Sequence, residues 1–140
     1  LDFAARFILD EIGIEFEDPE GDKLDGIIDR FGSTFPPTAK FSQLARETLP
    51  EVRAEDDPDV ALVAWLDHEE ALFRRLERRI VAERLEQGFV TPDGIDVDGF
   101  ISFSLGVHNR RKSRMGYSLE NHVSTVFDAF GLTYARGATT

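Results

Sequence analysis

The chain has no cysteine among its 140 residues, and it has only one Met, one Trp and two Tyr. The lack of cysteine excludes a disulfide framework and any metal site with thiolate ligands, and it is compatible with a reducing compartment. No apolar run approaches the roughly 20 residues that a membrane-spanning helix needs, and no signal peptide is visible. We therefore expect a cytoplasmic protein that has no membrane partner.

Positive charge is the scarcer kind, with 16 Lys and Arg against 27 Asp and Glu and a net charge of −11. The acidic excess lies in residues 1–100, which hold 25 of the 27 acidic residues, whereas residues 101–140 hold 5 Lys and Arg against 2 acids. Four of these cations lie within "RRKSR", residues 110–114. This asymmetry is typical of a protein with a solvated part and a part that faces a polyanion, although such cations also decorate exposed turns.

Apolar residues are plentiful enough for a packed core, since 41% of the chain is hydrophobic and twelve residues are Phe. The polar stretch "LPEVRAEDDP" indicates a domain boundary or linker. We expect residues 1–50 to form a helical segment and connector, and residues 51–140 to form the second unit. Because the chain begins at Leu1 inside an amphipathic pattern, we interpret it as a piece of a longer protein.

Apolar periodicity predicts a mostly helical chain. The best-marked helix has Asp57 as its N-cap, Pro58 as its first residue, and an end near Glu86 before Gly88. Its predicted buried stripe is Leu62, Trp65, Leu66, Leu72, Phe73, Leu76, Ile80 and Val81. Its opposite face, predicted to be solvated and laced with ion pairs such as Glu70 to Arg74, is Glu70, Arg74, Arg75, Glu77, Arg78, Arg79 and Glu83.

Shorter elements are predicted on either side of this helix. Further helices are expected over residues 2–12, 22–31 with Asp22 as the cap, 39–48 and 117–130. The stretch "VTPDGIDVDG" is expected to form a turn, and "FISFSLGV" fits either a helix capped by Asp98, which we favour, or a strand. Gly116 is expected to break the chain before residues 117–130, and "LTYARGA" has the pattern of an incipient strand.

The predicted helix over residues 117–130 carries the first candidate for chemistry. Its predicted buried stripe is Leu119, Val123, Val126, Phe127 and Phe130, which places Glu120 at the border and His122 on the other flank. A carboxylate near a helix N-terminus is stabilised by the helix dipole, and Ser118 with Asn121 resembles a cap, so Glu120 has a purely structural interpretation. Its functional interpretation is a metal ligand or catalytic carboxylate, because Mg²⁺ takes one or two protein carboxylates together with phosphate oxygens.

The basic stretch beside Glu120 is the second candidate, as a binding site for the backbone of a nucleic acid. Arg110 and Arg114 are four residues apart and share a helix face, whereas Arg111 and Lys112 point elsewhere. Other chemistry has little support. The three His show no metal-binding spacing, no Gly-rich phosphate loop is present, and His122 is interpreted as a structural residue.

Residues 109–138, "NRRKSRMGYSLENHVSTVFDAFGLTYARGA", resemble the start of the catalytic domain of EcoRII-type type II restriction endonucleases. That family has an Arg/Lys-rich stretch, a glycine, an "SLENH" helix and a strand carrying "RGA". The segments "FPPTAKFSQLAR" and "DPDVALVAWLDHEEALFRRLERRIVAERL" are similar to the region just upstream, so the resemblance begins near residue 33. Residues 1–32 are placed only loosely, as the tail of an N-terminal effector domain. The resemblance implies that residues 51–140 are the N-terminal part of the nuclease catalytic domain.

The resemblance implies an α/β fold, a PD-(D/E)xK nuclease core with a mixed sheet between helices, although this chain is expected to be mostly α-helical. It also implies a homodimer that makes Mg²⁺-dependent double-strand cuts in double-stranded DNA at a short CC-W-GG-like site. Glu120 matches the family's helix glutamate, as a catalytic residue and metal ligand, and the residues that match the DNA-binding stretch are Arg110, Arg111, Lys112, Ser113 and Arg114.

The resemblance also implies an Asp and a Lys in the active site that this chain does not contain. They are expected after the "RGA" strand, so we predict that these 140 residues do not cleave DNA by themselves. Two other functions stay open. One is a non-enzymatic, acidic, helical module that binds DNA or regulates a partner through the basic stretch, and the other is a structural interaction module that uses the long amphipathic helix.

Overall fold

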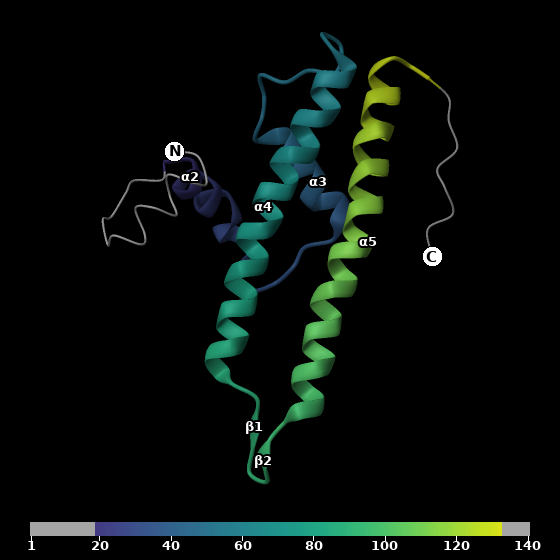
Figure 1. Ribbon diagram of the computed structural model, residues 1–140. Helices are drawn as coiled ribbons and strands as arrows, with labels where there is room; N and C mark the ends of the chain where they lie inside the picture. Colours follow the sequence, from purple (N-terminus) through teal and green to yellow (C-terminus); the bar gives the residue numbers. More distant parts are fainter. Residues whose placement is uncertain (1–18, 133–140) are drawn as a thin grey trace, which may run out of the picture.

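The computed structural model describes residues 19–132, so the helix expected over residues 2–12 and the strand expected at "LTYARGA" lie outside the described residues. Two long helices, α4 (Pro58–Gln87) and α5 (Val97–Ala129), run side by side in opposite directions (Figure 1). A short hairpin of β1 (Val90–Thr91) and β2 (Gly94–Ile95) joins them. Two shorter helices, α2 (Pro19–Ile28) and α3 (Thr38–Glu47), pack beside this pair, and α2 contacts the middle of α4. The 3-10 turn η1 (Asp29–Phe31) follows α2.

Helix α4 confirms the sequence prediction at both ends. The Asp57 carboxylate accepts a hydrogen bond from the N–H of Val60 at 3.2 Å, which pairs one donor that the first turn of a helix leaves without a partner. Pro58 fits the first helical position because its missing N–H would have no partner there. Gly88 ends the helix at a φ of 76°, a conformation that favours glycine.

Helix α5 contradicts the prediction of a break at Gly116, because one helix runs without interruption from Val97 to Ala129. Its N-cap is Asp96, which accepts a hydrogen bond from the N–H of Gly99 at 2.9 Å, so the predicted cap by Asp98 is wrong. The predicted helix over "FISFSLGV" is confirmed. A glycine costs only about 1 kcal/mol inside a helix relative to Ala, and packing of α5 against α4 and α3 outweighs that cost.

Two smaller predictions also need correction. The expected turn at "VTPDGIDVDG" contains an antiparallel hairpin in which Val90 pairs with Ile95 and Thr91 with Gly94. Helix α2 begins at Pro19, so Asp22 lies inside the helix and is not its cap. The expected helix over residues 39–48 is confirmed as α3, within one residue at each end.

Replacing Gly116 by alanine should raise the free energy of unfolding by about 0.5–1 kcal/mol. A Cβ added at Gly116 would meet no atom within 4 Å, and the residue is exposed in the middle of α5. Urea denaturation of the variant checks this result. Gly88→Ala is the matched control and should lower stability, because its φ of 76° strains any L-residue with a Cβ. A loss of stability in Gly116→Ala would show that glycine is required there.

The main core joins α2, α3 and α4. It contains Leu24, Ile28, Phe41, Ala45, Leu72, Phe73 and Leu76. Ion pairs from Arg75 to Asp25 and from Arg79 to Asp29 lie beside this core and hold α2 and η1 on α4. A second cluster of Ala54, Ala61 and Trp65 covers the start of α4. The expected division of the chain at residue 50 stays a prediction.

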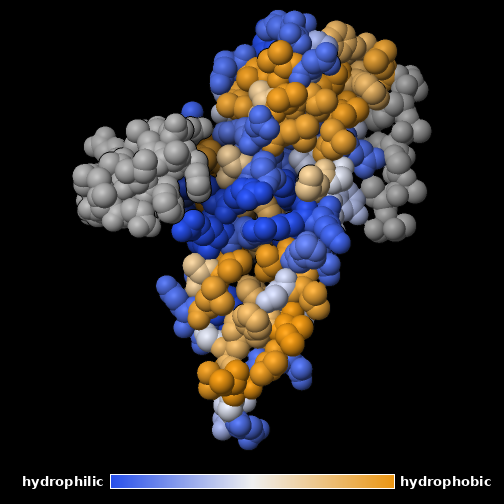
Figure 2. Space-filling model, in the orientation of Figure 1, coloured by the Kyte–Doolittle hydropathy of each residue, from blue (hydrophilic) through white to orange (hydrophobic). Residues whose placement is uncertain are grey.

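Much apolar surface stays exposed where α4 and α5 extend beyond α2 and α3. In Figure 2 apolar side chains gather at the hairpin end and at the opposite end, and a hydrophilic band lies between them. Val90 and Ile95 of the hairpin are 75% and 80% exposed, and Ile101 and Leu105 of α5 are also exposed. Within residues 19–132 no helix is sufficiently long and apolar to span a bilayer.

Candidate nucleic-acid interface

The face of α5 that packs against α3 and α4 is polar. Its buried residues are Arg114, Ser118, His122 and Ser124. Leu119 and Phe130, which were predicted to be buried, are 47% and 49% exposed, so the predicted apolar stripe is wrong for these two residues. The neighbouring helices α4 and α3 present a buried carboxylate and an arginine toward α5. Polar groups of α5 face inward because they form hydrogen bonds with these two side chains.

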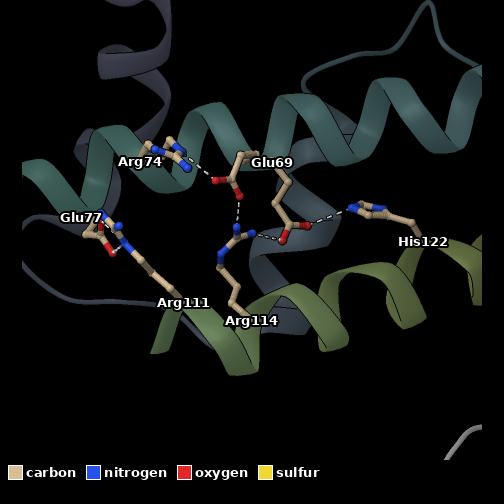
Figure 3. A network of polar contacts seen from close by, with 7 residues as sticks. Glu69, Arg74, Glu77, Arg111, Arg114 and His122 are labelled. Carbon is tan, nitrogen blue, oxygen red and sulfur yellow. Dashed lines mark hydrogen bonds and ion pairs between the residues drawn. The ribbon is translucent and has the colours of Figure 1, made fainter. Parts of the chain in front are cut away.

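Glu69 of α4 is the centre of this polar contact (Figure 3), and its side chain is 0% exposed. Its Oε2 accepts a hydrogen bond from Nη1 of Arg114 at 3.2 Å, and its Oε1 accepts one from Nε2 of His122 at 2.8 Å. Arg114 also pairs with Glu70, and its guanidinium lies 4.1 Å from the ring centre of Phe73. A buried carboxylate is tolerated because several donors surround it.

His122 links this carboxylate to α3. Nη1 of Arg46 lies 3.0 Å from Nδ1 of His122, and arginine can only donate, so Nδ1 is the acceptor. The network therefore assigns the ring proton to Nε2, which donates to Glu69. The ring is fully buried and packs against Trp65, with 5.7 Å between ring centres. The structural interpretation of His122 is confirmed.

The pKa of Glu69 lies below its ordinary value, so the carboxylate is ionised at neutral pH. Burial alone would raise that pKa, but hydrogen bonds from His122, Ser42 and Ser118 stabilise the charged form more strongly. Burial lowers the pKa of Arg46, although a guanidinium stays charged in proteins. The contact between α3, α4 and α5 is thus a network of ions that carry their charges inside the protein.

A second ion pair joins the long helices nearer the hairpin. Nε of Arg111 donates to both carboxylate oxygens of Glu77 at 2.9 Å, and Nη2 donates to the same group. Hydrogen bonds from Arg111 to Glu77 raise the pKa of this guanidinium. Glu77 is buried, so its predicted place on the solvated face of α4 is wrong, whereas the predicted pair of Glu70 and Arg74 is confirmed at 2.7 Å.

The five predicted DNA-binding residues therefore point around the whole circumference of α5. Arg111 and Arg114 are paired with carboxylates of α4. Lys112 is exposed, and the hydroxyl of Ser113 donates to the carbonyl of Asn109 at 3.1 Å. The guanidinium of Arg110 lies 4.1 Å from the ring centre of Phe35, in the connector before α3. The structure brings Arg110, Ser113 and Arg114 together around one cavity and leaves Lys112 and Arg111 outside it.

That cavity has a volume of about 110 Å³ and lies between the start of α3 and the middle of α5. Its apolar wall consists of Phe35, Phe41 and Phe73, and its other lining residues are Pro36, Thr38, Arg110, Ser113, Arg114 and Tyr117. The rings of Phe35 and Phe73 stack with 5.6 Å between their centres. A hollow with aromatic walls and two guanidinium groups suits a flat or anionic group rather than a cation.

Glu120 is half-buried in the interior of α5, more than five turns from its start. The two structural interpretations of Glu120, stabilisation by a helix N-terminus and a cap formed by Ser118 and Asn121, therefore do not apply. Glu120 follows Ser113 by seven residues, so both lie on the same flank of the helix. Within the described part of the chain, no group of three or more His, Asp and Glu residues is placed to hold a metal ion.

Sequence reasoning missed Glu69, although its position contains a signal. Glu69 lies four residues after Trp65 and three before Leu72, which places it on the predicted apolar stripe of α4. A carboxylate at such a position requires buried donors, and Arg114 and His122 supply them. The spacing does not say which donors these are, because they come from a helix 45 to 53 residues away.

Comparison with known proteins agrees with the ordered match around Glu120. Residues 73–140 match the family model described as "EcoRII C terminal". The type II restriction enzyme EcoRII of Escherichia coli is 34% identical over 100 residues, which cover 71% of this chain and 23% of the relative. The chain thus matches about a quarter of the length of that relative. No solved structure matches the chain.

Proposed function

We propose that the chain is part of a type II restriction endonuclease, because residues 73–140 match the EcoRII C-terminal family. The proposed enzyme is a homodimer that binds double-stranded DNA and makes Mg²⁺-dependent double-strand cuts at a short CC-W-GG-like site. The proposed fold of the whole enzyme is a PD-(D/E)xK core, to which α4 and α5 contribute the helical part. The family match over the stretch that contains Glu120 and the basic residues carries the proposal.

The flank of α5 that carries Arg110, Ser113 and Glu120 is the proposed DNA-facing side. Within residues 19–132 Arg110 has no ion pair with a carboxylate, whereas Arg111 and Arg114 have bidentate or buried pairs that DNA would have to break. We therefore assign the backbone contacts to Arg110, Lys112 and Ser113. Arg111 and Arg114 then support DNA binding indirectly, because they fix the rotation of α5 against α4.

The exposed apolar surface of α5 supports a larger nuclease core. Met115 and Leu119 are exposed, and they line a hollow of about 310 Å³ against Leu66 of α4. A sheet that packs on a helix buries apolar side chains of this kind. We propose that the nuclease sheet covers the flank with Met115 and Leu119. The flank with Glu120 then faces the active site.

Mg²⁺ is the proposed cofactor, and Glu120 is proposed as one of its ligands. A protein site for Mg²⁺ typically uses one or two carboxylates, and the ion completes its shell with water and phosphate oxygens. Glu120 alone does not form such a site, and residues 19–132 contain no cluster that could complete it.

Glu120→Gln in the whole enzyme should lower the rate of plasmid cleavage by about 10–100-fold or more and leave DNA binding intact. The substitution keeps the size of the side chain and removes the charge that the ion requires. Glu86→Gln, an exposed acid near the end of α4, is the control and should cleave normally. Unchanged cleavage by Glu120→Gln would remove Glu120 from the mechanism. If the wild-type protein binds DNA specifically but never cleaves it, the alternative function as a non-enzymatic DNA-binding module is favoured over the nuclease.

A further inference from the structure

Helix α3 begins with backbone donors that have no partner. Its N-cap is Pro37, whose side chain makes no capping hydrogen bond, and the first internal bond runs from Phe41 N–H to the carbonyl of Pro37. The N–H groups of Thr38, Ala39 and Lys40 therefore have no backbone or capping acceptor within the described residues. The first turn contains no acid that could neutralise the positive end of the helix dipole.

A buried and incompletely paired arginine lines the cavity beside this helix end. The side chain of Arg114 is 8% exposed, and its buried Nε–H has no hydrogen-bond partner among residues 19–132, although its two other nitrogens bind carboxylates. Thr38 and Pro36 line the same cavity from the α3 side. The first residue of α3 and the buried arginine of α5 therefore line one hollow.

Arg110 lies at the edge of this hollow and is held by an aromatic ring. Its guanidinium packs over Phe35 at 4.1 Å, a contact that engages one face of the group and leaves the N–H donors at its edge available. Within residues 19–132 it makes no hydrogen bond or ion pair that would occupy these donors. The aromatic wall of Phe35, Phe41 and Phe73 keeps water from one side, which strengthens any charge–charge contact at the edge.

We propose that the N-terminus of α3 and Arg110 together form a binding site for one phosphate group. Backbone N–H groups at a helix N-terminus bind phosphate readily, and a planar guanidinium can contact two of its oxygens. The identification of this phosphate as one in a DNA backbone rests on the proposed function, whereas binding of the free ion does not. Arg110 precedes Glu120 by ten residues, about 15 Å along α5, so one DNA strand could pass both residues.

Thermal unfolding with inorganic phosphate tests the site in the absence of DNA. Compared with chloride at the same ionic strength, phosphate should raise the Tm of the wild-type protein by on the order of 3 °C. Arg110→Gln should lose this shift. Arg78→Gln, which removes an exposed cation of α4 outside the cavity, should keep it. A shift that both variants keep, or that both lose, would overturn the proposal.

A second variant tests the helix end without a risk of unfolding. Asp at an N-cap accepts hydrogen bonds from the first turn, so Pro37→Asp should raise the Tm without phosphate. The same carboxylate should occupy the phosphate position and abolish the phosphate-induced shift. A stabilised variant that still responds to phosphate in full would show that the N-terminus of α3 is not the binding site.

The salt dependence of DNA binding identifies the source of the phosphate. For a short duplex, the slope of the logarithm of the binding constant against the logarithm of the salt concentration should decrease in magnitude by about 0.9 in Arg110→Gln, which corresponds to the loss of one phosphate contact. Pro37→Asp should reduce the slope by a similar amount. An unchanged slope in both variants would overturn the assignment to DNA. A protein that binds no duplex and yet keeps the Arg110-dependent phosphate shift would retain this site and refute the proposed function instead.

Discussion

Glu69→Ala is expected to destabilise the protein by about 3–5 kcal/mol, the usual effect of removing one partner from a buried ion pair. The variant leaves Nε2–H of His122 without its acceptor and Arg114 with only its contact to Glu70. Both groups are buried, so water cannot replace the lost carboxylate without opening the contact between α4 and α5. Since a domain of this size is stable by about 5–15 kcal/mol, one substitution removes a large share.

Urea denaturation of Glu69→Ala beside Glu70→Ala tests this expectation. Glu70 is 40% exposed and makes no hydrogen bond to His122; after its loss Arg114 keeps Glu69 as a partner and water can solvate the exposed Arg74. Its loss should cost about 1 kcal/mol or less. Equal losses in the two variants would show that burial of Glu69 contributes nothing beyond an ordinary surface pair.

A pH series on Glu69→Gln separates the charge of Glu69 from its packing. Since the folded-state pKa of Glu69 lies below its ordinary value, its charge contributes stability above the unfolded-state pKa. That contribution is lost as the pH falls through the lower, folded-state pKa. The stability difference between wild type and variant should therefore be constant near neutral pH and become smaller below about pH 4.3. A difference that does not change with pH would assign the whole effect to shape.

Leu72→Ala is expected to cost about 2–5 kcal/mol, through lost burial and the cavity that remains. Leu72 is fully buried, in a cluster with Leu24, Ile28 and Phe41, where α2 and α3 meet α4. Because these side chains come from three helices, the site cannot collapse without moving one of them. A Tm measurement combined with urea denaturation gives the size of the effect.

Val63→Ala is the control for the Leu72 substitution. Val63 lies on the same helix and is 57% exposed, so its truncation should change stability by less than about 0.5 kcal/mol. If Leu72→Ala costs no more than this control, the packing of α2 and α3 on α4 does not stabilise the protein. If it costs the expected amount, the packing of α2 and α3 on α4 contributes a large share of the stability.

The long helix α4 could be predicted from the sequence because its determinants are local. Asp57, Pro58 and Gly88 mark its ends through backbone chemistry within one turn, and its apolar spacing predicts the buried residues Trp65, Leu72 and Leu76. The family resemblance was equally local, since it depends on the order of residues in one continuous stretch. The match to the EcoRII C-terminal family confirms it.

The single helix α5 could not be predicted from the sequence, because Gly116 locally favours a break in the helix. Packing against other helices stabilises the continuous helix in spite of this glycine. The buried side of α5 was also misassigned. Apolar spacing favours Leu119 inside, but burying Arg114 and His122 satisfies Glu69, and an unpaired buried carboxylate costs more than an exposed leucine. Which side turns inward thus depends on residues about 50 positions earlier in the chain.

The helical composition, the limits of α3 and α4 and the match of residues 73–140 to a family model all follow from local sequence patterns. The neutralisation of individual cations depends instead on contacts between helices. Arg111 and Arg114 meet Glu77 and Glu69 across the helix pair, whereas Arg110 meets Phe35 beside the start of α3. Periodicity predicts the direction of a side chain around its own helix, whereas charge pairing depends on which residue a different helix places opposite it.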